Sequence, residues 1–176
     1  MTENQIESEI VNLIAFFDRM YKIFNLDYSI ELSTRPEEKY IGKIEVWDKS
    51  EKALADACKK AGKDYQINPG DGAFYGPKLD FHIKDSLGRT WQCGTIQLDM
   101  NLPERFDITY IDEFGEKKRP VMLHRVIFGS VERFIGILIE HYAGAFPLWM
   151  APVQLNIIPV NNKYHLEYSK KLKDLL

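Results

Sequence analysis

The sequence predicts a mixed α and β fold, and three features support this prediction. Apolar residues recur at helical spacing over residues 2–25. Residues 78–84 instead alternate apolar with polar, which is the pattern of a strand with one buried face. A turn at residues 85–88 then reverses the chain into a second strand, residues 89–98, so we expect the two strands to form a hairpin.

Local signals define the elements ahead of this hairpin. Thr2 and Gln5 have the spacing of a capping box at the start of the first helix. Pro36 ends the first strand, and Gly62 is a suitable C-terminal cap for the second helix. The expected order is a helix at residues 2–25, a strand at 28–32, a helix at 46–61 and a short strand at 65–67.

The second strand of the hairpin has no clean apolar face. Its odd positions hold Trp91, Cys93, Thr95 and Gln97, and its even positions hold Gln92, Gly94, Ile96 and Leu98. Together with the glycine-rich loop at residues 70–77, this polar strand predicts a binding site, because local rules tend to fail at functional sites. The loop alone is equally explained by simple turns, and the glutamines by an exposed face.

The second half of the chain is predicted to hold two more strands and two helices. We expect strands at residues 107–111 and 119–124 joined by a turn at 112–115, a helix at 128–142, a strand at 153–160 and a helix at 163–176. An isolated strand and helix cannot bury both faces, so the last two elements are expected to begin a second α/β domain. The predicted boundaries are 1–146 for the first domain, 147–152 for a linker and 153–176 for the start of the second.

Arg133 is an unusual residue for its position. It lies in the first turn of a predicted helix, where the helix dipole favours anions and disfavours cations. An anion bound at this end would explain it, and Gly129, Ser130 and Gly136 would then complete a flat, donor-rich platform for a phosphate or nucleotide. The alternative is that Arg133 pairs with Glu132 or another surface carboxylate.

The composition is that of an ordinary globular protein. The net charge is −3 and the hydrophobic fraction is 45%, so charge alone does not indicate a dedicated nucleic-acid binder. Cys58 and Cys93 are the only cysteines and have no metal-ligand spacing, which favours a reducing compartment without disulfides. No apolar run predicts a membrane span and the first residues do not resemble a signal peptide, so we expect a cytoplasmic protein.

Four motifs carry a resemblance to a known family. They are residues 72–78 (Gly-Ala-Phe-Tyr-Gly-Pro-Lys), 92–98 (Gln-Cys-Gly-Thr-Ile-Gln-Leu), 122–125 (Met-Leu-His-Arg) and 129–134 (Gly-Ser-Val-Glu-Arg-Phe), with shorter matches at 33–37, 47–49 and 151–154. In this order they closely resemble threonyl-tRNA synthetases. Several motifs in register are far more specific than one glycine-rich loop.

The resemblance implies a class II aminoacyl-tRNA synthetase fold, in which helices flank an antiparallel sheet. Residues 1–146 would be part of the catalytic domain, and residues 153–176 the truncated start of the anticodon-binding domain. The implied activity is that of a threonine–tRNA ligase, which activates threonine with ATP and Mg and transfers it to tRNA-Thr. The complete enzyme is expected to contain zinc and to be a homodimer.

The resemblance also implies roles for individual residues. Arg133 matches the arginine of the class's third motif, which binds the ATP phosphates, in agreement with the dipole argument. The implied sites are catalytic for Arg133 and Lys78, threonine-binding for Tyr75, Gln97 and Cys93, ATP-binding for Gln92, Thr95, Gly129, Ser130 and Arg133, and zinc-binding for His124.

The resemblance begins just after the family's second motif. The arginine of that motif, the other two zinc ligands and the editing region would therefore lie upstream, and His124 alone is one of about three protein ligands that a catalytic zinc needs. We expect a fragment of a threonine-activating ligase that is inactive alone. Two alternatives stay open: a non-catalytic synthetase-like module that binds a partner or a nucleotide, and a synthetase for another amino acid such as proline or serine.

These implied roles predict an irregular second strand. Gln92 and Thr95 are both assigned to the adenosine side, although alternate residues of a regular strand face opposite ways and these two differ in parity. Glycine within a strand often marks a bulge. We therefore expect a bulge at residues 93–95, which brings Gln92, Thr95 and Gln97 to one cleft with Tyr75 and Arg133. The alternative is that Gln92 reaches the nucleotide around the edge of the strand.

Overall fold

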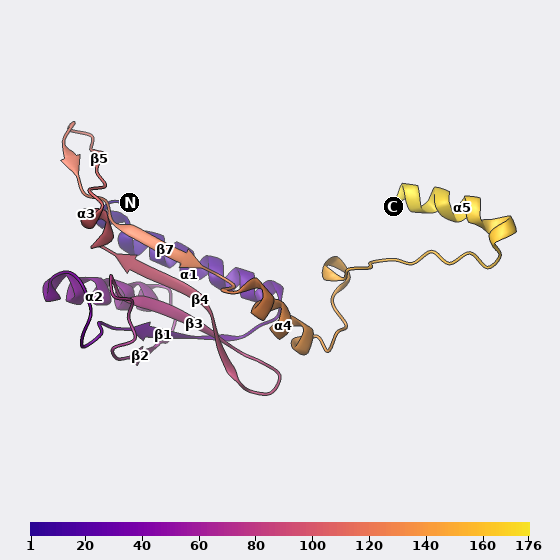
Figure 1. Cartoon of the computed structure of the whole chain (residues 1–176), viewed down its shortest axis with the longest axis horizontal. Coiled ribbons are helices and arrows are strands. Elements are labelled where there is room, and N and C mark those ends of the chain that lie inside the picture. Colours follow the sequence, from indigo (N-terminus) through magenta and orange to yellow (C-terminus); the bar gives the residue numbers. More distant parts are fainter. The chain divides into compact units, whose positions relative to one another are not determined.

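A five-stranded sheet forms the centre of the larger part of the protein (Figure 1). The computed structural model describes residues 1–176 and divides them into two compact units, Met1–His141 and Tyr142–Leu176. In spatial order the strands are β2 (Gln66–Asn68), β1 (Tyr28–Ser33), β3 (Lys78–Lys84), β4 (Thr90–Asp99) and β7 (Met122–Val126). All neighbouring pairs are antiparallel except β1 and β2, which are parallel. The α+β prediction with an antiparallel sheet is confirmed.

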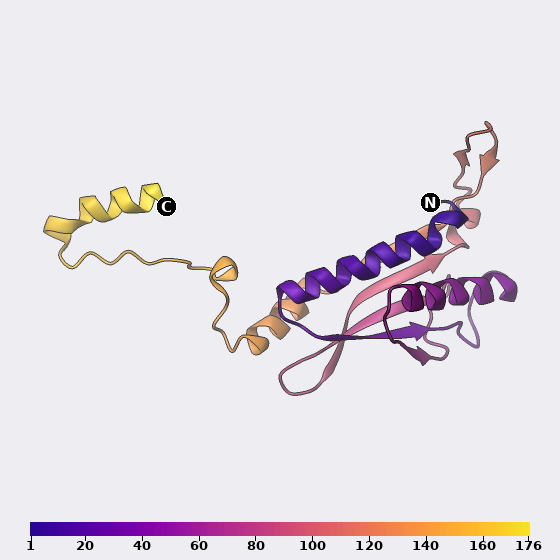
Figure 2. The same cartoon turned by 180° about the vertical axis from the view of Figure 1, so that it is seen from behind.

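Two long helices cover one face of the sheet, as Figure 2 shows from behind. They are α1 (Ile6–Ile23) and α2 (Ile44–Lys60). A short 3-10 turn, η1 (Glu3–Gln5), precedes α1, and the predicted capping box is present because the Thr2 N–H donates to Gln5 Oε1 at 2.9 Å. The predicted cap of α2 also forms, with Gly62 at φ +65°.

The two faces of the sheet differ in polarity. The helix-covered face is apolar and includes Ile30, Leu32, Leu79, Phe81, Ile96 and Leu98, all at most 3% exposed. These side chains pack against α2 and against the buried stripe of α1, in which Ile10, Ile14, Phe17 and Tyr21 are fully buried. Burial of this apolar surface against α1 and α2 drives the fold. The opposite face, which neither α1 nor α2 covers, carries most of the polar residues of the strands, among them Glu31, Asp80 and Thr95, which are register partners on neighbouring strands.

The hairpin predicted in the second half of the chain forms at the predicted turn, but the bounds of its strands are wrong. The turn at residues 112–115 joins β5 (Tyr110–Ile111) to β6 (Lys117–Lys118), which form a separate two-stranded sheet. The predicted second strand, residues 119–124, is not the partner in this hairpin, because β6 ends at Lys118 and residues 122–124 belong to β7, which pairs with β4. Pro120 stands between β6 and β7, and it has no N–H to donate to a strand ladder.

Two short helical elements complete the larger unit. They are α3 (Leu102–Arg105) and α4 (Val131–His141). α4 occupies the predicted position, with Phe134, Ile137 and Leu138 buried. None of the helices is both long and apolar enough to cross a membrane.

The second unit contains a 3-10 turn, η2 (Leu148–Met150), and α5 (Asn162–Leu175), whose N-terminus is capped by Asn161 accepting from the Lys163 N–H at 2.8 Å. The predicted strand at residues 153–160 is wrong, because these residues belong to no strand. Their apolar side chains are exposed, for example Ile158 at 83% and Val160 at 94%. Apolar residues form a strand only where a neighbouring segment accepts and donates ladder hydrogen bonds, and no segment of this unit does so.

Candidate active site on the open face of the sheet

A β-bulge lies at the predicted place in β4. Phe81 pairs with Gly94, but the next residue, His82, pairs with Gln92, so Cys93 has no partner on β3. The bulge changes the parity of the strand and brings Gln92 onto the same face as Thr95. Nε2 of Gln92 is 3.1 Å from Oγ1 of Thr95, which confirms the predicted bulge and the shared face.

Gly94 explains why the irregularity occurs here. A Cβ at this position would lie 2.4 Å from Phe17 and 2.5 Å from the Tyr21 hydroxyl, both on α1. Only glycine therefore allows α1 to approach β4 this closely. The close contact between α1 and Gly94 thus lies next to the bulge. The bulge places Gln92 on the polar face of the sheet, away from α1.

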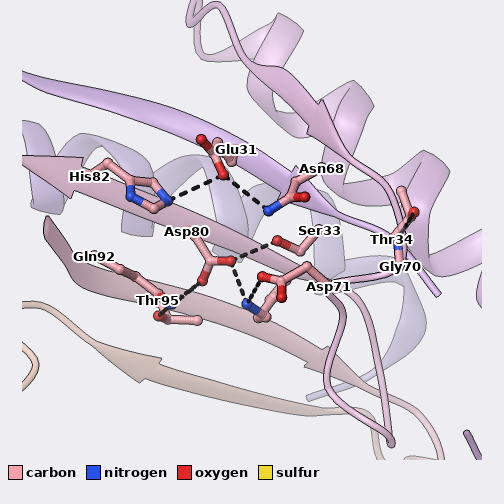
Figure 3. A network of polar contacts seen from close by, with 11 residues as sticks. Glu31, Ser33, Thr34, Asn68, Gly70, Asp71, Asp80, His82, Gln92 and Thr95 are labelled. Atoms are coloured by element: carbon pink, nitrogen blue, oxygen red, sulfur yellow. Dashed lines mark hydrogen bonds and ion pairs between the residues drawn. The ribbon is translucent and has the colours of Figure 1, made fainter. Parts of the chain in front are cut away.

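A buried carboxylate, that of Asp80, accepts hydrogen bonds from several polar side chains of this face (Figure 3). Asp80 on β3 is 1% exposed. Its Oδ2 accepts hydrogen bonds from Ser33 at 2.7 Å and Lys78 at 2.6 Å, and its Oδ1 from Gln92 at 2.5 Å and Thr95 at 3.2 Å. One carboxylate therefore links strands β1, β3 and β4.

Lys78 is held by two carboxylates. Its ammonium donates to Asp80 and, at 3.0 Å, to Asp71 in the glycine-rich loop. Burial by itself lowers the pKa of Lys78, but the hydrogen bonds to Asp80 and Asp71 outweigh burial and raise the pKa. Lys78 is therefore a fixed cation and not a proton donor near neutral pH.

Tyr75, Gln97 and His124 form a second group further along the face. The Tyr75 hydroxyl donates to Oε1 of Gln97, and the Tyr75 and His124 rings are 5.3 Å apart between centroids. Burial and the negative charge of Asp99 raise the pKa of the Tyr75 phenol, so it stays a hydrogen-bond donor. A hollow of about 210 Å³ lies beside this group, lined by Thr95, Gln97, His124, Arg125 and Val126.

Arg133 connects the start of α4 to the bulge. Its Nη2 donates to the main-chain carbonyl of Gln92 at 2.6 Å, and its guanidinium lies 5.9 Å from the centre of the Trp91 ring. The alternative pairing with Glu132 does not occur, since the Glu132 carboxylate accepts from Ser130 at 2.9 Å. Arg133 is exposed and lies in the first turn of α4, as predicted.

Gly129 and Ser130 shape the turn before α4. Gly129 has φ +66°, and a Cβ there would lie 2.8 Å from the Cys93 carbonyl, so glycine permits this close approach to the bulge. Ser130 Oγ accepts from the Arg133 N–H at 3.3 Å. The predicted phosphate platform is thus adjacent to the bulge of β4.

Cys93 is buried at the bulge, with 2% exposure. Burial raises the pKa of its thiol, although the nearby Arg133 acts in the opposite direction. The thiol is therefore protonated near neutral pH and is not an exposed ligand group. Cys93 contributes to this region through packing and through its main-chain carbonyl.

His124 alone does not make a metal centre in these residues. Its Nε2 lies 2.9 Å from Oδ2 of the buried Asp99. No group of three or more His, Cys, Asp or Glu residues in residues 1–176 is arranged to hold a metal ion. The residues present therefore do not fit a zinc site by themselves.

Sequence reasoning missed the two buried carboxylates, Asp80 and Asp99. Both occupy polar positions on strands. Asp80 alternates with apolar residues in the same way as Lys78 and His82, and this spacing indicates that the three share one face of the sheet. Their burial was not predictable from the alternation, because that pattern places polar side chains on the face away from the core.

The chain matches the family model described as "tRNA synthetase class II core domain (G, H, P, S and T)" over residues 1–142. It therefore belongs to this class II tRNA synthetase family. Within the family it is similar to threonine–tRNA ligases: it is 63% identical to that of Fusobacterium nucleatum over 99% of this chain, and 60% identical to that of Acetivibrio thermocellus over 100%.

Solved structures agree with this similarity. The RNA-binding domain of threonyl-tRNA synthetase from Cryptosporidium parvum has a TM-score of 0.93 and 42% identity, over 100% of this chain and 44% of that one. A putative threonyl-tRNA synthetase from Aeropyrum pernix has a TM-score of 0.74 and 30% identity, over 99% and 41%. The chain spans 29% and 27% of the length of the two curated relatives.

Proposed function

We propose that this chain provides part of the catalytic core of a threonine–tRNA ligase, which activates threonine with ATP and Mg and transfers it to tRNA-Thr. The observation that carries the proposal is the bulge of β4, which aligns Gln92, Thr95 and Gln97 on one polar face. Preorganised groups that hold the substrates in a fixed orientation are a major source of catalysis in acyl and phosphoryl transfer. The identity to threonine–tRNA ligases supports threonine as the substrate.

The proposed roles divide the face into two parts. Tyr75 and Gln97, beside the hollow near His124, contact the threonine, and the buried Cys93 shapes the floor through packing. Gln92 and Thr95 contact the adenosine. Arg133 holds the ATP phosphates, with Gly129 and Ser130 forming the turn that presents it, and Lys78 adds a fixed positive charge. His124 is the one zinc ligand that these residues contribute.

The proposed domain boundaries are residues 1–146 for the catalytic part, 147–152 for a linker and 153–176 for the start of an anticodon-binding domain. The family match over residues 1–142 supports the first boundary. The similarity of the whole chain to an RNA-binding domain of the C. parvum enzyme supports tRNA as a partner. Homodimer formation and a cytoplasmic location belong to the proposal for the complete enzyme.

Ligand binding tests the proposed site directly. We expect a non-hydrolysable threonyl-adenylate analogue to bind the 176-residue chain more tightly than its seryl counterpart, as measured by calorimetry. Tyr75→Phe removes the hydrogen bond to Gln97 and should weaken binding roughly 2- to 10-fold, the value of one hydrogen bond. Tyr168→Phe on α5, where Tyr168 is 65% exposed, is the matched control and should change nothing.

The proposal also predicts that the 176 residues do not form threonyl-adenylate by themselves. By the family resemblance, the arginine that holds the α-phosphate is not among them, so too few contacts to the transferring phosphate are present. Threonine-dependent pyrophosphate exchange should stay at the blank level. Exchange well above the blank would overturn the predicted inactivity, and equal binding of both adenylate analogues would overturn threonine as the substrate.

A further inference from the structure

Asp80 determines which hydrogen-bonding groups the sheet face offers to a ligand. It is 1% exposed and accepts hydrogen bonds from four side chains, those of Ser33, Lys78, Gln92 and Thr95 (Figure 3). Four donors, one of them an ammonium group, surround two oxygens. This environment requires the carboxylate form, which accepts hydrogen bonds and cannot donate them.

The carboxylate of Asp80 fixes the orientation of the Gln92 amide. Because Asp80 cannot donate, the nitrogen and not the oxygen of the amide must face it. Nε2 of Gln92 is 2.5 Å from Oδ1 of Asp80 and 3.1 Å from Oγ1 of Thr95, so both amide hydrogens have an acceptor. Gln92 is exposed, and its Oε1 takes part in neither bond. The amide therefore offers an acceptor to a ligand.

Thr95 is constrained in the same way. Its hydroxyl has one hydrogen, which it donates to Asp80 at 3.2 Å, and its oxygen accepts from Gln92. Thr95 has no donor left for a ligand. The pair therefore presents oxygen acceptors alone.

We infer that Asp80 is a positioning residue that makes this part of the site acceptor-only, so that it selects a hydrogen-bond donor of adenosine. The inference rests on the proposed function, which places adenosine beside Gln92 and Thr95. Adenosine has two kinds of donor, the amino group of the base and the ribose hydroxyls. A nucleotide whose base carries a carbonyl oxygen in place of the amino group, or whose ribose lacks the selected hydroxyl, binds more weakly. The reason is that an acceptor oxygen of the site is then left without a hydrogen-bond donor.

The first experiment needs no ligand. Side-chain amide NMR signals of Gln92 in the 176-residue chain should show slow hydrogen exchange compared with the exposed Gln66 amide. In Asp80→Asn the side chain at position 80 can donate as well as accept, so either end of the Gln92 amide can face it. The amide is then free to rotate, and its hydrogen exchange should become as fast as that of Gln66. Asp71→Asn is the matched control, because Asp71 shares Lys78 with Asp80 at 3.0 Å but has no contact with Gln92.

The second experiment measures binding of ATP, inosine triphosphate, 2′-deoxy-ATP and 3′-deoxy-ATP to the same proteins. The analogue that lacks the selected donor should bind roughly 10-fold more weakly than ATP to the unchanged chain, the upper value of one hydrogen bond. The identity of the weakly binding analogue shows whether the selected donor is the amino group of the base or a ribose hydroxyl. Asp80→Asn should reduce this ratio to within about 2-fold, whereas Asp71→Asn and Ser33→Ala should keep it.

The ratio of the ATP affinity to the analogue affinity distinguishes a positioning role of Asp80 from a simple loss of stability, because a loss of stability would weaken the binding of all four nucleotides alike. A full discrimination ratio in Asp80→Asn, or slow Gln92 exchange in that variant, would overturn the inference while leaving the proposed function in place. Absence of saturable ATP binding to the unchanged chain would instead overturn the nucleotide site itself. If Asp80→Asn does not fold by circular dichroism, the unchanged chain still tests the inference. Gln92 amide exchange as fast as that of Gln66, or equal binding of all four nucleotides, would overturn it.

Discussion

Asp99 on β4 and the partly exposed His124 on β7 form a pair across the two strands. Oδ2 of Asp99, a residue with 0% exposure, is 2.9 Å from Nε2 of His124. The other oxygen, Oδ1, accepts from the main-chain N–H groups of Asn101 and Leu102, each at 2.9 Å. One carboxylate therefore orients the imidazole of His124 and also caps the start of α3.

Asp99→Asn should reverse the tautomer of His124. In the unchanged chain the carboxylate requires the neutral ring to carry its hydrogen on Nε2. The amide of the variant can keep Oδ1 toward Asn101 and Leu102 and direct its NH2 toward His124, so the ring hydrogen moves to Nδ1. Nitrogen chemical shifts of the imidazole report the tautomer. His165, whose Nδ1 accepts from the Asn161 N–H at 3.2 Å, is the internal control and should not change.

The purified 176-residue chain should hold no stoichiometric zinc. His124 is the one zinc ligand proposed among these residues, and no group of three suitable side chains surrounds it. Zinc affinity depends on the number of ligands. Metal analysis after dialysis should therefore give well under one zinc per chain. One zinc per chain that disappears in His124→Ala would contradict this.

Gly94→Ala should destabilise the larger unit by about 1–3 kcal/mol, the usual effect of overpacking a core. The added methyl would lie 2.4 Å from Phe17 and 2.5 Å from the Tyr21 hydroxyl, and α1 would have to move. Urea unfolding measures the loss. Gly136→Ala in α4 is the matched control, because nothing lies within 4 Å of that position, and it should stabilise by roughly 0.5–1 kcal/mol. Equal effects of the two substitutions would disprove the packing argument.

Asp85 should make the β3–β4 hairpin sensitive to acid. Burial would raise the pKa of its carboxyl, but hydrogen bonds from Trp91 at 2.8 Å and from Arg89 outweigh burial and lower the pKa to about 2 from the ordinary 3.8. A lowered folded-state pKa means that the stabilisation is complete above pH 3.8 and is lost as the pH falls through about 2.

The test is the melting temperature as a function of pH for the unchanged chain and for Asp85→Asn. The variant should be less stable at pH 5 to 7, and the two curves should converge as the pH falls from about 4 to about 2, the interval between the two pKa values. Asp107→Asn, at an exposed ion pair with Arg119, is the control and should follow the unchanged chain. Parallel curves over the whole range would show that Asp85 contributes no such dependence.

Local patterns were sufficient for most of the fold. The helical period of α1, the alternation of β3 and the turn at residues 85–88 predicted their elements because each depends on neighbouring residues. The same reasoning failed at residues 153–160, where apolar side chains have no adjacent strand, and at residues 119–124, where Pro120 interrupts the pairing. Strand formation depends on a partner that can be distant in sequence, so local patterns predict it less well.

The sequence by itself determined the polar character of β4, the position of Arg133 in the first turn of α4, and the bulge around Gly94. The first two follow from residue type and spacing, whereas the bulge was predicted from the roles that the family resemblance implies for Gln92 and Thr95, together with the glycine between them. Only the tertiary structure decided that Asp80 and Asp99 are buried and that Asp80 collects donors from three strands. The physical reason is that burial and hydrogen-bond direction depend on which strands lie side by side, and the order β2-β1-β3-β4-β7 is set by long-range packing against α1 and α2.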